Sequence, residues 1–221
     1  MVRNRIIEEA GRLFDLYGIK AVSMDNIASW LNISKKTIYG NFRNKEELVF
    51  EYIRVAVDTG IRVVEDAEEK AVSPLEAIIL INTLTLEQVT SHCPAFFRDL
   101  ESYPTAKLKV FDEYVSLIGA KYIRHFFSCM EKGLFFEGTD MPLILDFFME
   151  QLKVAAEKFH AGQSQKEIKF INVIITFLAG MCTEKGREEL ILYQTCSDSR
   201  QGNTPKNHRR AGTFRIDTLH I

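Results

Sequence analysis

The side chains best suited to chemistry lie close together, between residues 23 and 45. They are cations, amides and hydroxyls: Ser23, Lys35, Lys36, Thr37, Tyr39, Asn41 and Lys45. Lysine can donate to guanine O6 and N7, asparagine can pair with adenine, and hydroxyls can donate to phosphate oxygens. The set therefore favours noncovalent recognition of DNA. The candidates for contact with base edges are Lys35, Lys36, Thr37 and Asn41.

Two short helices joined by a tight turn are needed to position this set. In the first helix, Ile27, Ala28 and Leu31 make a small apolar face. Asn32 follows, and asparagine tolerates the left-handed conformation that a tight turn requires. Ser34 can then cap the next helix by accepting a hydrogen bond from a free backbone N–H.

The second helix is predicted over residues 35–42, with Ile38 and Phe42 pointing back into the core. A helix-turn-helix that exposes cations and amides on its second helix is suited to the DNA major groove. Gly40 lies within this helix, where glycine costs about 1 kcal/mol relative to alanine. A close approach of the backbone to DNA would explain that glycine. An ordinary solvated helix face is the alternative interpretation, and the surrounding pattern argues against it.

With these features the segment resembles the N-terminal domain of TetR-type bacterial transcriptional regulators. The matching residues are Phe14, Gly18, Ser23, Ile27-Ala28, Ile33-Ser34, Thr37-Ile38-Tyr39, Phe42 and Lys45-Glu46-Glu47-Leu48. The resemblance implies that Ser23, Tyr39 and Lys45 contact the phosphate backbone. Two residues depart from the family pattern, since Lys36 stands where a small residue is usual and Asn32 where glycine is usual. Lys36 therefore changes the surface that would meet DNA.

Charge is distributed unevenly along the chain. The net charge is only −2, yet residues 1–45 hold eight Lys or Arg residues against four acidic ones. The N-terminal part is therefore basic and the remainder acidic. A basic end on an acidic body is expected of a protein that presents one end to phosphates.

The spacing of apolar residues predicts an all-α chain with three parts. Residues 1–47 form a three-helix helix-turn-helix head, residues 48–195 form a helical bundle, and residues 196–221 form a flexible polar tail. The first helix, residues 3–17, has a predicted buried stripe of Ile6, Ala10, Leu13, Phe14 and Tyr17. From Pro104 a single long helix is predicted, with a stripe of Leu108, Phe111, Val115, Ile118, Tyr122, Phe126 and Cys129.

Aromatic residues gather between residues 96 and 148. A helical core is the simplest interpretation, and a cavity for an apolar effector is the interpretation that the resemblance favours. Polar groups that could orient such a ligand are His92, Tyr103, Tyr122 and His125. The predicted ligand-binding set is Phe97, Tyr103, Tyr122, His125 and Phe126.

Other classes of protein find little support. The four cysteines form no CxxC pair, which is typical of reduced, mostly buried thiols. His125 and Cys129 are four residues apart on one helix face, but a pair is too few for a metal site, so neither metal nor cofactor is expected. A nucleophile-elbow serine and a phosphate loop are both missing from the sequence, so we do not expect an enzyme. The sequence has no apolar run long enough to span a bilayer, and its N-terminus does not resemble a secretory signal. We therefore expect a cytoplasmic protein with no membrane partner.

The combined interpretation is a homodimeric regulator that binds double-stranded operator DNA, as a repressor released by a small hydrophobic ligand. The alternative is a DNA-binding regulator without an effector, whose body serves dimerisation or recruits another protein. The resemblance places dimerisation in the last two predicted helices, residues 140–160 and 166–194, with Ile171 and Ile175 in the contact. Two copies related by a twofold axis would then set their recognition helices about 34 Å apart, one turn of DNA.

Overall fold

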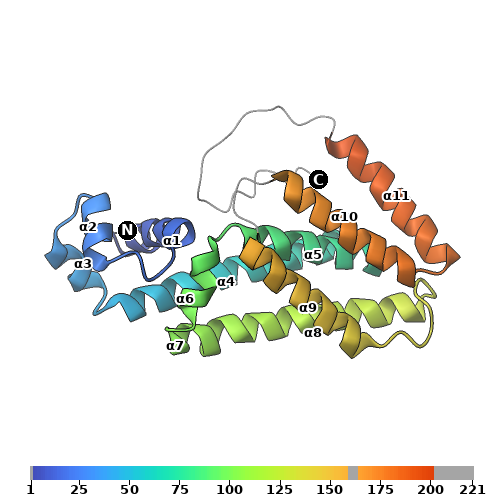
Figure 1. Ribbon diagram of the computed structural model, residues 1–221, viewed down its shortest axis with the longest axis horizontal. Helices are drawn as coiled ribbons and strands as arrows, with labels where there is room; N and C mark the ends of the chain where they lie inside the picture. Colours follow the sequence, from blue (N-terminus) through green and yellow to red (C-terminus); the bar gives the residue numbers. More distant parts are fainter. Residues whose placement is uncertain (1, 159–163, 202–221) are drawn as a thin grey trace.

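The computed structural model describes residues 2–158 and 164–201. The described residues are helical apart from loops, turns and one isolated bridge between Phe135 and Cys182. Helices α1 to α3 form a compact head at one end of the molecule, and α5 to α11 form the body (Figure 1). Helix α4 (Lys45–Lys70) runs from the head into the body and so joins the two. The predicted all-α class is confirmed.

The head consists of α1 (Val2–Tyr17), α2 (Met24–Trp30) and α3 (Lys35–Asn41). Its core contains side chains that are at most 2% exposed, among them Ile6, Ala10, Phe14, Ile27, Ile38 and Phe42. Gly18 ends α1 with a φ of +87°, a conformation that glycine adopts without steric cost. The predicted stripe of α1 holds except at Tyr17, which is 58% exposed. Tyr17 lies in the last turn of α1.

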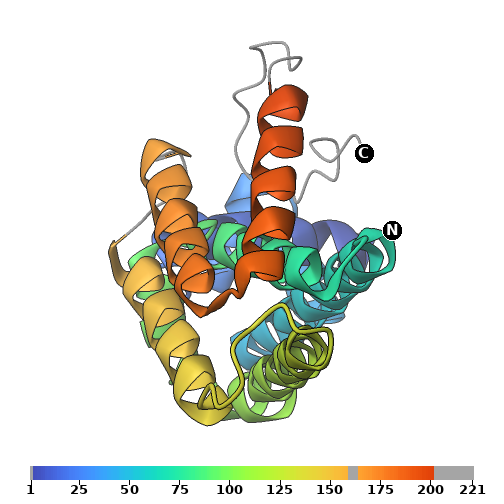
Figure 2. The same cartoon turned by 90° about the vertical axis from the view of Figure 1, so that its right-hand side faces the viewer.

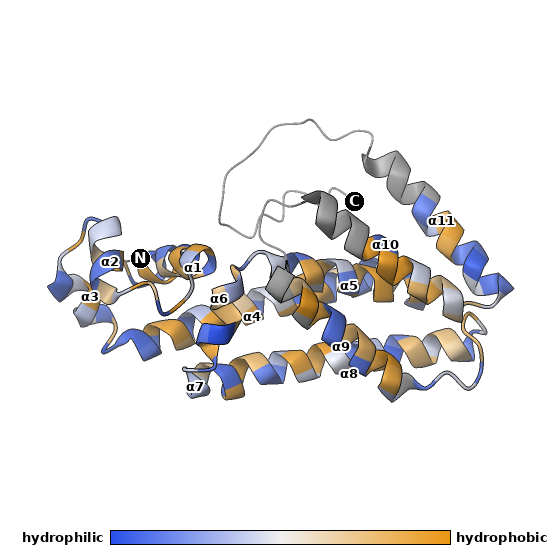
Figure 3. Ribbon diagram, in the orientation of Figure 1, coloured by the Kyte–Doolittle hydropathy of each residue, from blue (hydrophilic) through white to orange (hydrophobic). Residues whose placement is uncertain are grey.

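The body begins with α5 (Pro74–Thr90) and α6 (Pro94–Leu100). Each of these helices has a proline in its first turn, where the missing N–H costs no hydrogen bond. Helices α5 and α10 carry long apolar stretches (Figure 3). Gly60 of α4 faces the Gln88 side chain of α5, where an added Cβ would lie 2.9 Å from the amide nitrogen. The missing side chain therefore lets α4 and α5 pack closely.

The predicted single helix from Pro104 is interrupted near its start. It consists of α7 (Pro104–Ala106), a π-helical segment η1 (Lys107–Phe111) and α8 (Asp112–Glu131). A π turn holds more residues than an α turn, so it shifts the phase of the buried face. Leu108 is consequently 61% exposed, against the prediction. Beyond the interruption the predicted residues Ile118, Tyr122, Phe126 and Cys129 are all buried.

The last three helices are α9 (Met141–Lys158), α10 (Ser164–Met181) and α11 (Glu184–Gln201), which lie around one side of α5 and α8 (Figure 2). The helix predicted over residues 166–194 is in fact two helices. The break has a clear cause, because the Thr183 N–H donates to the Leu134 carbonyl (2.9 Å) and the Thr183 hydroxyl caps α11 by accepting from the Gly186 N–H (3.3 Å). The 133–138 connector thus takes a backbone bond that a continuous helix would need.

Helix α11 continues past residue 195, where the flexible tail was predicted to begin. The remainder of that predicted tail, residues 202–221, lies outside the described residues. Within the described ranges, we find no helix whose length and apolar character would suffice to cross a membrane.

Candidate nucleic-acid interface

The turn between α2 and α3 is built by short-range hydrogen bonds. Ser23 caps α2 by accepting from the Asn26 N–H (3.0 Å), and Ser34 caps α3 by accepting from the Thr37 N–H (3.0 Å). Asn32 adopts a φ of +53°, and the Ile33 N–H donates to the Ala28 carbonyl (3.0 Å). The predicted roles of Ser34 and Asn32 are confirmed. Each helix starts from a side-chain cap, so the angle between α2 and α3 is set by local contacts.

Helix α3 presents one exposed face. Lys36 is exposed and Tyr39 is 51% exposed. An added Cβ at Gly40 would meet no atom within 4 Å, so packing inside the chain does not explain this glycine. The face around Lys36, Tyr39 and Gly40 is therefore open to a partner that approaches the backbone closely.

Three of the four base-edge candidates have hydrogen-bond partners in the chain, and for Thr37 the hydroxyl lies 2.8 Å from the Ser34 hydroxyl. The Lys35 ammonium lies 2.5 Å from the Asp25 carboxylate of α2, and this hydrogen bond raises the pKa of Lys35. The Asn41 amide donates to the Thr37 carbonyl (2.8 Å). The Lys35 and Asp25 side chains are both exposed, and exposed ion pairs contribute little to the free energy of folding. The Lys35 and Asn41 side chains can therefore exchange their present partners for a base at low cost.

Lys45, predicted to contact phosphate, is only partly exposed. Its Nζ lies 6.0 Å from the centroid of the Phe14 ring, so the side chain folds back onto α1. Burial lowers the pKa of the Lys45 ammonium, and the negative charge of Asp99 opposes that effect. To reach a phosphate, Lys45 would have to leave the Phe14 ring. Ser23, by contrast, is exposed at the N-terminus of α2.

Two arginines of the head were not singled out from the sequence. The Arg43 side chain is 90% exposed directly after α3, and its backbone N–H donates to Glu47 (2.9 Å). Arg3 lies over the Phe42 ring at 4.2 Å and donates to the Asn41 carbonyl, which fixes α1 to the end of α3. Arg43 could have been found as a cation flanking the recognition helix. Arg3 could not, because its partners come together only in the fold.

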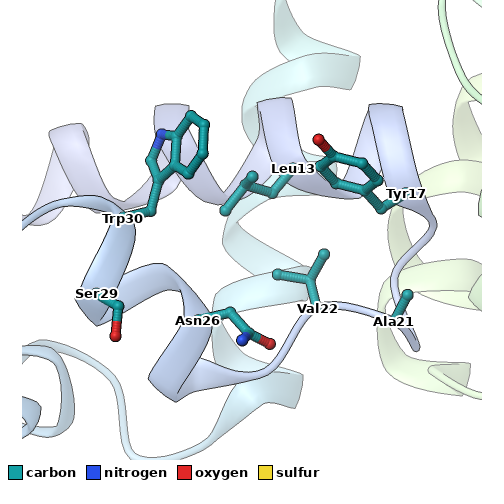
Figure 4. A pocket seen from close by; sticks show the side chains of 7 residues that line it. All are labelled: Leu13, Tyr17, Ala21, Val22, Asn26, Ser29 and Trp30. Carbon is teal, nitrogen blue, oxygen red and sulfur yellow. The ribbon is translucent and has the colours of Figure 1, made fainter.

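A surface hollow of about 540 Å³ lies between α1 and α2 (Figure 4). It is lined by Leu13, Tyr17, Ala21, Val22, Asn26, Ser29 and Trp30. Trp30 is 60% exposed and donates from its indole nitrogen to Glu9 (3.2 Å). Trp30 and Tyr17 flank the hollow from different helices, which leaves an apolar patch on the head.

The five predicted ligand-binding residues separate into different environments. Tyr122 and Phe126 are buried, and both rings lie 6.0 Å from Phe148 of α9. Phe97 packs against Phe111 (5.9 Å) in a second aromatic group nearer the head. His125 lies with its Nε2 2.6 Å from a Glu68 carboxylate oxygen.

Tyr103, the fifth, is partly buried, and burial raises its pKa. Tyr122 and Phe126 therefore share a site, while the other predicted residues lie in separate contacts.

The remaining candidates for chemistry in the body are its histidine, cysteine and acidic side chains. In the part of the chain that the structure describes, we find no group of three His, Cys, Asp or Glu residues that could hold a metal ion. Cys129 and Cys182 are buried, and burial raises their pKa values to about 12 and about 11. Both are therefore neutral, poorly nucleophilic thiols near neutral pH.

Comparison with known proteins agrees with this geometry in the head. Residues 6–52 match the family model described as "Bacterial regulatory proteins, tetR family". The HTH-type transcriptional regulator SAB2452 of Staphylococcus aureus is 41% identical over 59 residues, which cover 27% of this chain and 32% of that protein. The chain thus matches about a third of that relative's length, and the sequence similarity concerns the head.

Solved structures extend the similarity to most of the chain. A TetR-family transcriptional regulator from Marinobacter aquaeolei VT8 has a TM-score of 0.70 at 19% identity, covering 89% of this chain and 98% of its own. The structure of AibR in complex with isovaleryl coenzyme A and operator DNA has a TM-score of 0.61 at 17% identity, covering 82% and 98%. At such identities these structures establish a common fold. Residues 6–52 thus match the TetR-type helix-turn-helix domain, and the chain shares the all-helical fold of solved TetR-family regulators.

Proposed function

We propose that this chain is a transcriptional regulator that binds double-stranded operator DNA with α3. The observation that carries the proposal is the open face of α3, where Lys36 and Tyr39 are exposed and a Cβ at Gly40 would meet no atom within 4 Å. The head over residues 1–47 would read the DNA, with Ser23, Tyr39 and Lys45 on phosphates. Lys35, Lys36, Thr37 and Asn41 would approach base edges.

We further propose that two copies pair through the body, residues 48–195, so that two heads read two half-sites. Exposed apolar side chains on the last two helices support this, since Val173 is 58% exposed on α10, and Ile191 and Leu192 are 58% and 64% exposed on α11. Ile171 and Ile175, the residues first predicted for the contact, are partly buried against the chain's own core. The pairing surface therefore centres on Val173 and the exposed face of α11.

A small hydrophobic effector that releases the protein from its operator is the third part of the proposal. Two buried polar atoms support it, the Tyr122 hydroxyl and the Asn82 side-chain oxygen, because neither has a hydrogen-bond partner among the described residues. A buried polar atom without a partner costs free energy. A ligand that carries a hydroxyl or an amide on an apolar frame would satisfy both atoms.

The two atoms lie at similar levels in the body. Helices α5 and α8 run antiparallel (Figure 1), and the Tyr114 hydroxyl donates to Gln88 (2.6 Å) between them. At 1.5 Å per residue, Asn82 lies about 9 Å along α5 from Gln88, and Tyr122 about 12 Å along α8 from Tyr114. The two atoms therefore lie in the same direction from this contact and at comparable heights along the two helices. AibR, of similar fold, has been solved with both a ligand and operator DNA.

The alternative function is a regulator without an effector. The packing of Tyr122, Phe126 and Phe148 against one another favours it, since these rings fill the space between α8 and α9. An effector would have to bind the DNA-incompetent form more tightly than the competent one, because equal binding shifts nothing. A thermal-shift screen of neutral apolar compounds, followed by DNA binding with each hit, separates the two functions.

Selection of bound fragments from genomic DNA with the purified protein tests the main proposal. We expect a short sequence with two related half-sites whose centres are about 10 base pairs apart or a multiple of that distance. Binding without sequence preference at moderate salt would contradict an operator-specific regulator. A recovered motif with one half-site only would contradict the paired heads.

A further inference from the structure

A hydrogen-bonded cluster joins the head to the body away from the DNA-binding face. One Asp15 carboxylate oxygen, at the end of α1, accepts from the Tyr52 hydroxyl of α4 (2.6 Å). The same oxygen lies 2.8 Å from Nδ1 of His92, in the segment between α5 and α6. His92 is only 7% exposed. Asp15, Tyr52 and His92, here called the junction cluster, thus bring together three separate parts of the chain.

Two glycines, Gly11 in α1 and Gly18 directly after it, leave room for the side chains that α1 packs against. An added Cβ at Gly11 would lie 2.2 Å from the Tyr52 ring, so Tyr52 can cross α1 and reach Asp15 only because residue 11 is glycine. A glycine inside a helix costs about 1 kcal/mol relative to alanine. At Gly18 an added Cβ would lie 2.8 Å from the Ala95 side chain of α6. Both glycines therefore permit close packing of α1 against α4 and α6.

Backbone contacts fix the head to α6 beside the junction cluster. The Cys93 N–H donates to the Asp15 carbonyl (2.7 Å), and the Lys20 N–H donates to the buried Asp99 carboxylate (2.8 Å). The last turn of α1 thus meets the first turn of α6, where a free carbonyl and a free N–H satisfy each other. Any rotation of the head relative to α6 would break these bonds.

Aromatic rings continue from the junction cluster into the body. The His92 ring stacks on Phe96 at 4.1 Å and meets the edge of Phe97 at 5.3 Å. Phe97 in turn packs on Phe111 of the π-helical segment at 5.9 Å. The position of His92, and with it the head, is therefore fixed by the start of α8. Rigid ring contacts of this kind transmit displacement because packed interiors deform little.

We propose that Asp15, Tyr52 and His92 are positioning residues that hold each head against α4 and α6 and so set the spacing of the two heads on the operator. None of the three is among the residues proposed to touch DNA. The inference rests on the proposed function, a dimer reading two half-sites. It adds a place in the structure where head spacing is determined.

The test compares three variants with the wild type on two DNA fragments. His92→Leu removes the imidazole donor, His92→Asn keeps an amide donor near the position of Nδ1, and Tyr52→Phe removes the second donor. Tyr114→Phe is the matched control, because it also removes a tyrosine hydroxyl that makes a 2.6 Å hydrogen bond, but inside the body. One fragment carries the complete operator from the selection, and the other carries a single half-site.

We expect His92→Leu and Tyr52→Phe to weaken binding to the complete operator by about tenfold, which corresponds to about 1.4 kcal/mol. Binding to the single half-site should stay within about twofold of the wild type, since each head is intact. His92→Asn should restore most of the loss, and Tyr114→Phe should leave both fragments unaffected. Equal losses on both fragments would overturn the proposal and indicate a damaged head, as would full retention of operator affinity.

A measurement without DNA decides the same question. Hydrogen exchange of the Lys20 and Cys93 amides should accelerate at least about tenfold in His92→Leu, because the head then separates from α6 more often. Unchanged exchange would overturn the proposal even where operator binding is lost. If the wild type binds no DNA while His92→Leu still shows the accelerated exchange, the proposed function is refuted and the junction cluster remains as the site that holds the head.

Discussion

Single residues of the head have distinct electrostatic surroundings, and these predict distinct effects on DNA binding. Lys36 is exposed on α3 and forms no ion pair with any described residue, whereas Lys35 is paired with Asp25. Lys45 is folded over Phe14. An exposed lysine needs no rearrangement to meet DNA, but a folded one must first leave its packed position. Three lysines within one segment are therefore not equivalent.

Replacing Lys36 with glycine should relax the preference for one base position. A side chain that donates to a base edge contributes about 1–3 kcal/mol of discrimination against the wrong base. Affinities for a set of operators, each changed at a single position, measure this effect. Lys70→Gly at the far end of α4 removes the same charge and should change none of them. A uniform loss over all sequences would make Lys36 a phosphate contact instead.

Replacing Lys45 with alanine tests whether the folded lysine reaches a phosphate when DNA binds. Loss of one phosphate contact should lower the salt slope of log affinity by about 1, at the same fractional cost for every sequence. Titrations at several salt concentrations measure the slope. If slope and affinity both stay unchanged, Lys45 has a packing role against Phe14 only.

At the scale of helices, an ionic group ties α4 to α8. The two Glu68 carboxylate oxygens lie 2.6 Å from Lys121, 2.6 Å from Arg124 and 2.6 Å from His125. The Glu68 and Lys121 side chains are each 10% exposed. Burial disfavours the charged carboxylate, but hydrogen bonds from Lys121 and His125 outweigh it, and the pKa of Glu68 is lowered from 4.5. The charged group therefore stabilises the fold.

Glu68→Gln should lower the free energy of unfolding by about 3 kcal/mol, since it leaves the buried Lys121 ammonium without its nearest carboxylate. The pKa of Glu68 is lower in the folded than in the unfolded protein. The contribution of Glu68 to the free energy of unfolding is therefore fully present above about pH 4.5, and it is lost as the pH falls through the folded pKa. Urea denaturation should show a smaller loss at pH 3 than at pH 7. An equal loss at both pH values would contradict an ionic contribution.

The break between α10 and α11 gives a second prediction at this scale. An added Cβ at Gly186 would lie 2.1 Å from the Leu134 carbonyl oxygen, whereas one at Gly180 would meet nothing within 4 Å. Gly186→Ala should therefore destabilise the protein by at least about 2 kcal/mol. Gly180→Ala should be neutral or stabilise by up to about 1 kcal/mol through helix propensity. Thermal unfolding of both variants measures the difference, and equal effects would contradict the close contact.

The whole molecule joins a basic head to a body with exposed apolar residues on its last helices. Val173→Glu should give monomers that keep their helical content, because Val173 is 58% exposed and the new carboxylate can stay in solvent. Ile171→Glu should instead destabilise the fold, since Ile171 packs against the cluster of Leu86, Leu152 and Ala155. Sedimentation together with circular dichroism separates the two effects. A wild type that sediments as a monomer at micromolar concentration would contradict the dimer.

The sequence by itself determined the head. Its helices begin at local caps, the turn needs only Asn32 at a positive φ, and the core follows from residues a few positions apart. Caps and turns depend on residues that are close together in the sequence, so helix starts elsewhere in the chain were also predictable. The same reasoning identified Lys35 and Lys36 as exposed on α3.

Tertiary structure alone decided which distant residues meet. The π-helical segment that exposes Leu108, the break at Thr183 and the inward fold of Lys45 all depend on contacts from other elements. Asp15 and His92 are 77 residues apart, and His92 had been considered for its ability to orient a ligand. Helical periodicity gives the face on which a residue lies but not the partner that covers it. The partner depends on how helices pack, which is the physical reason that the junction cluster could not be predicted.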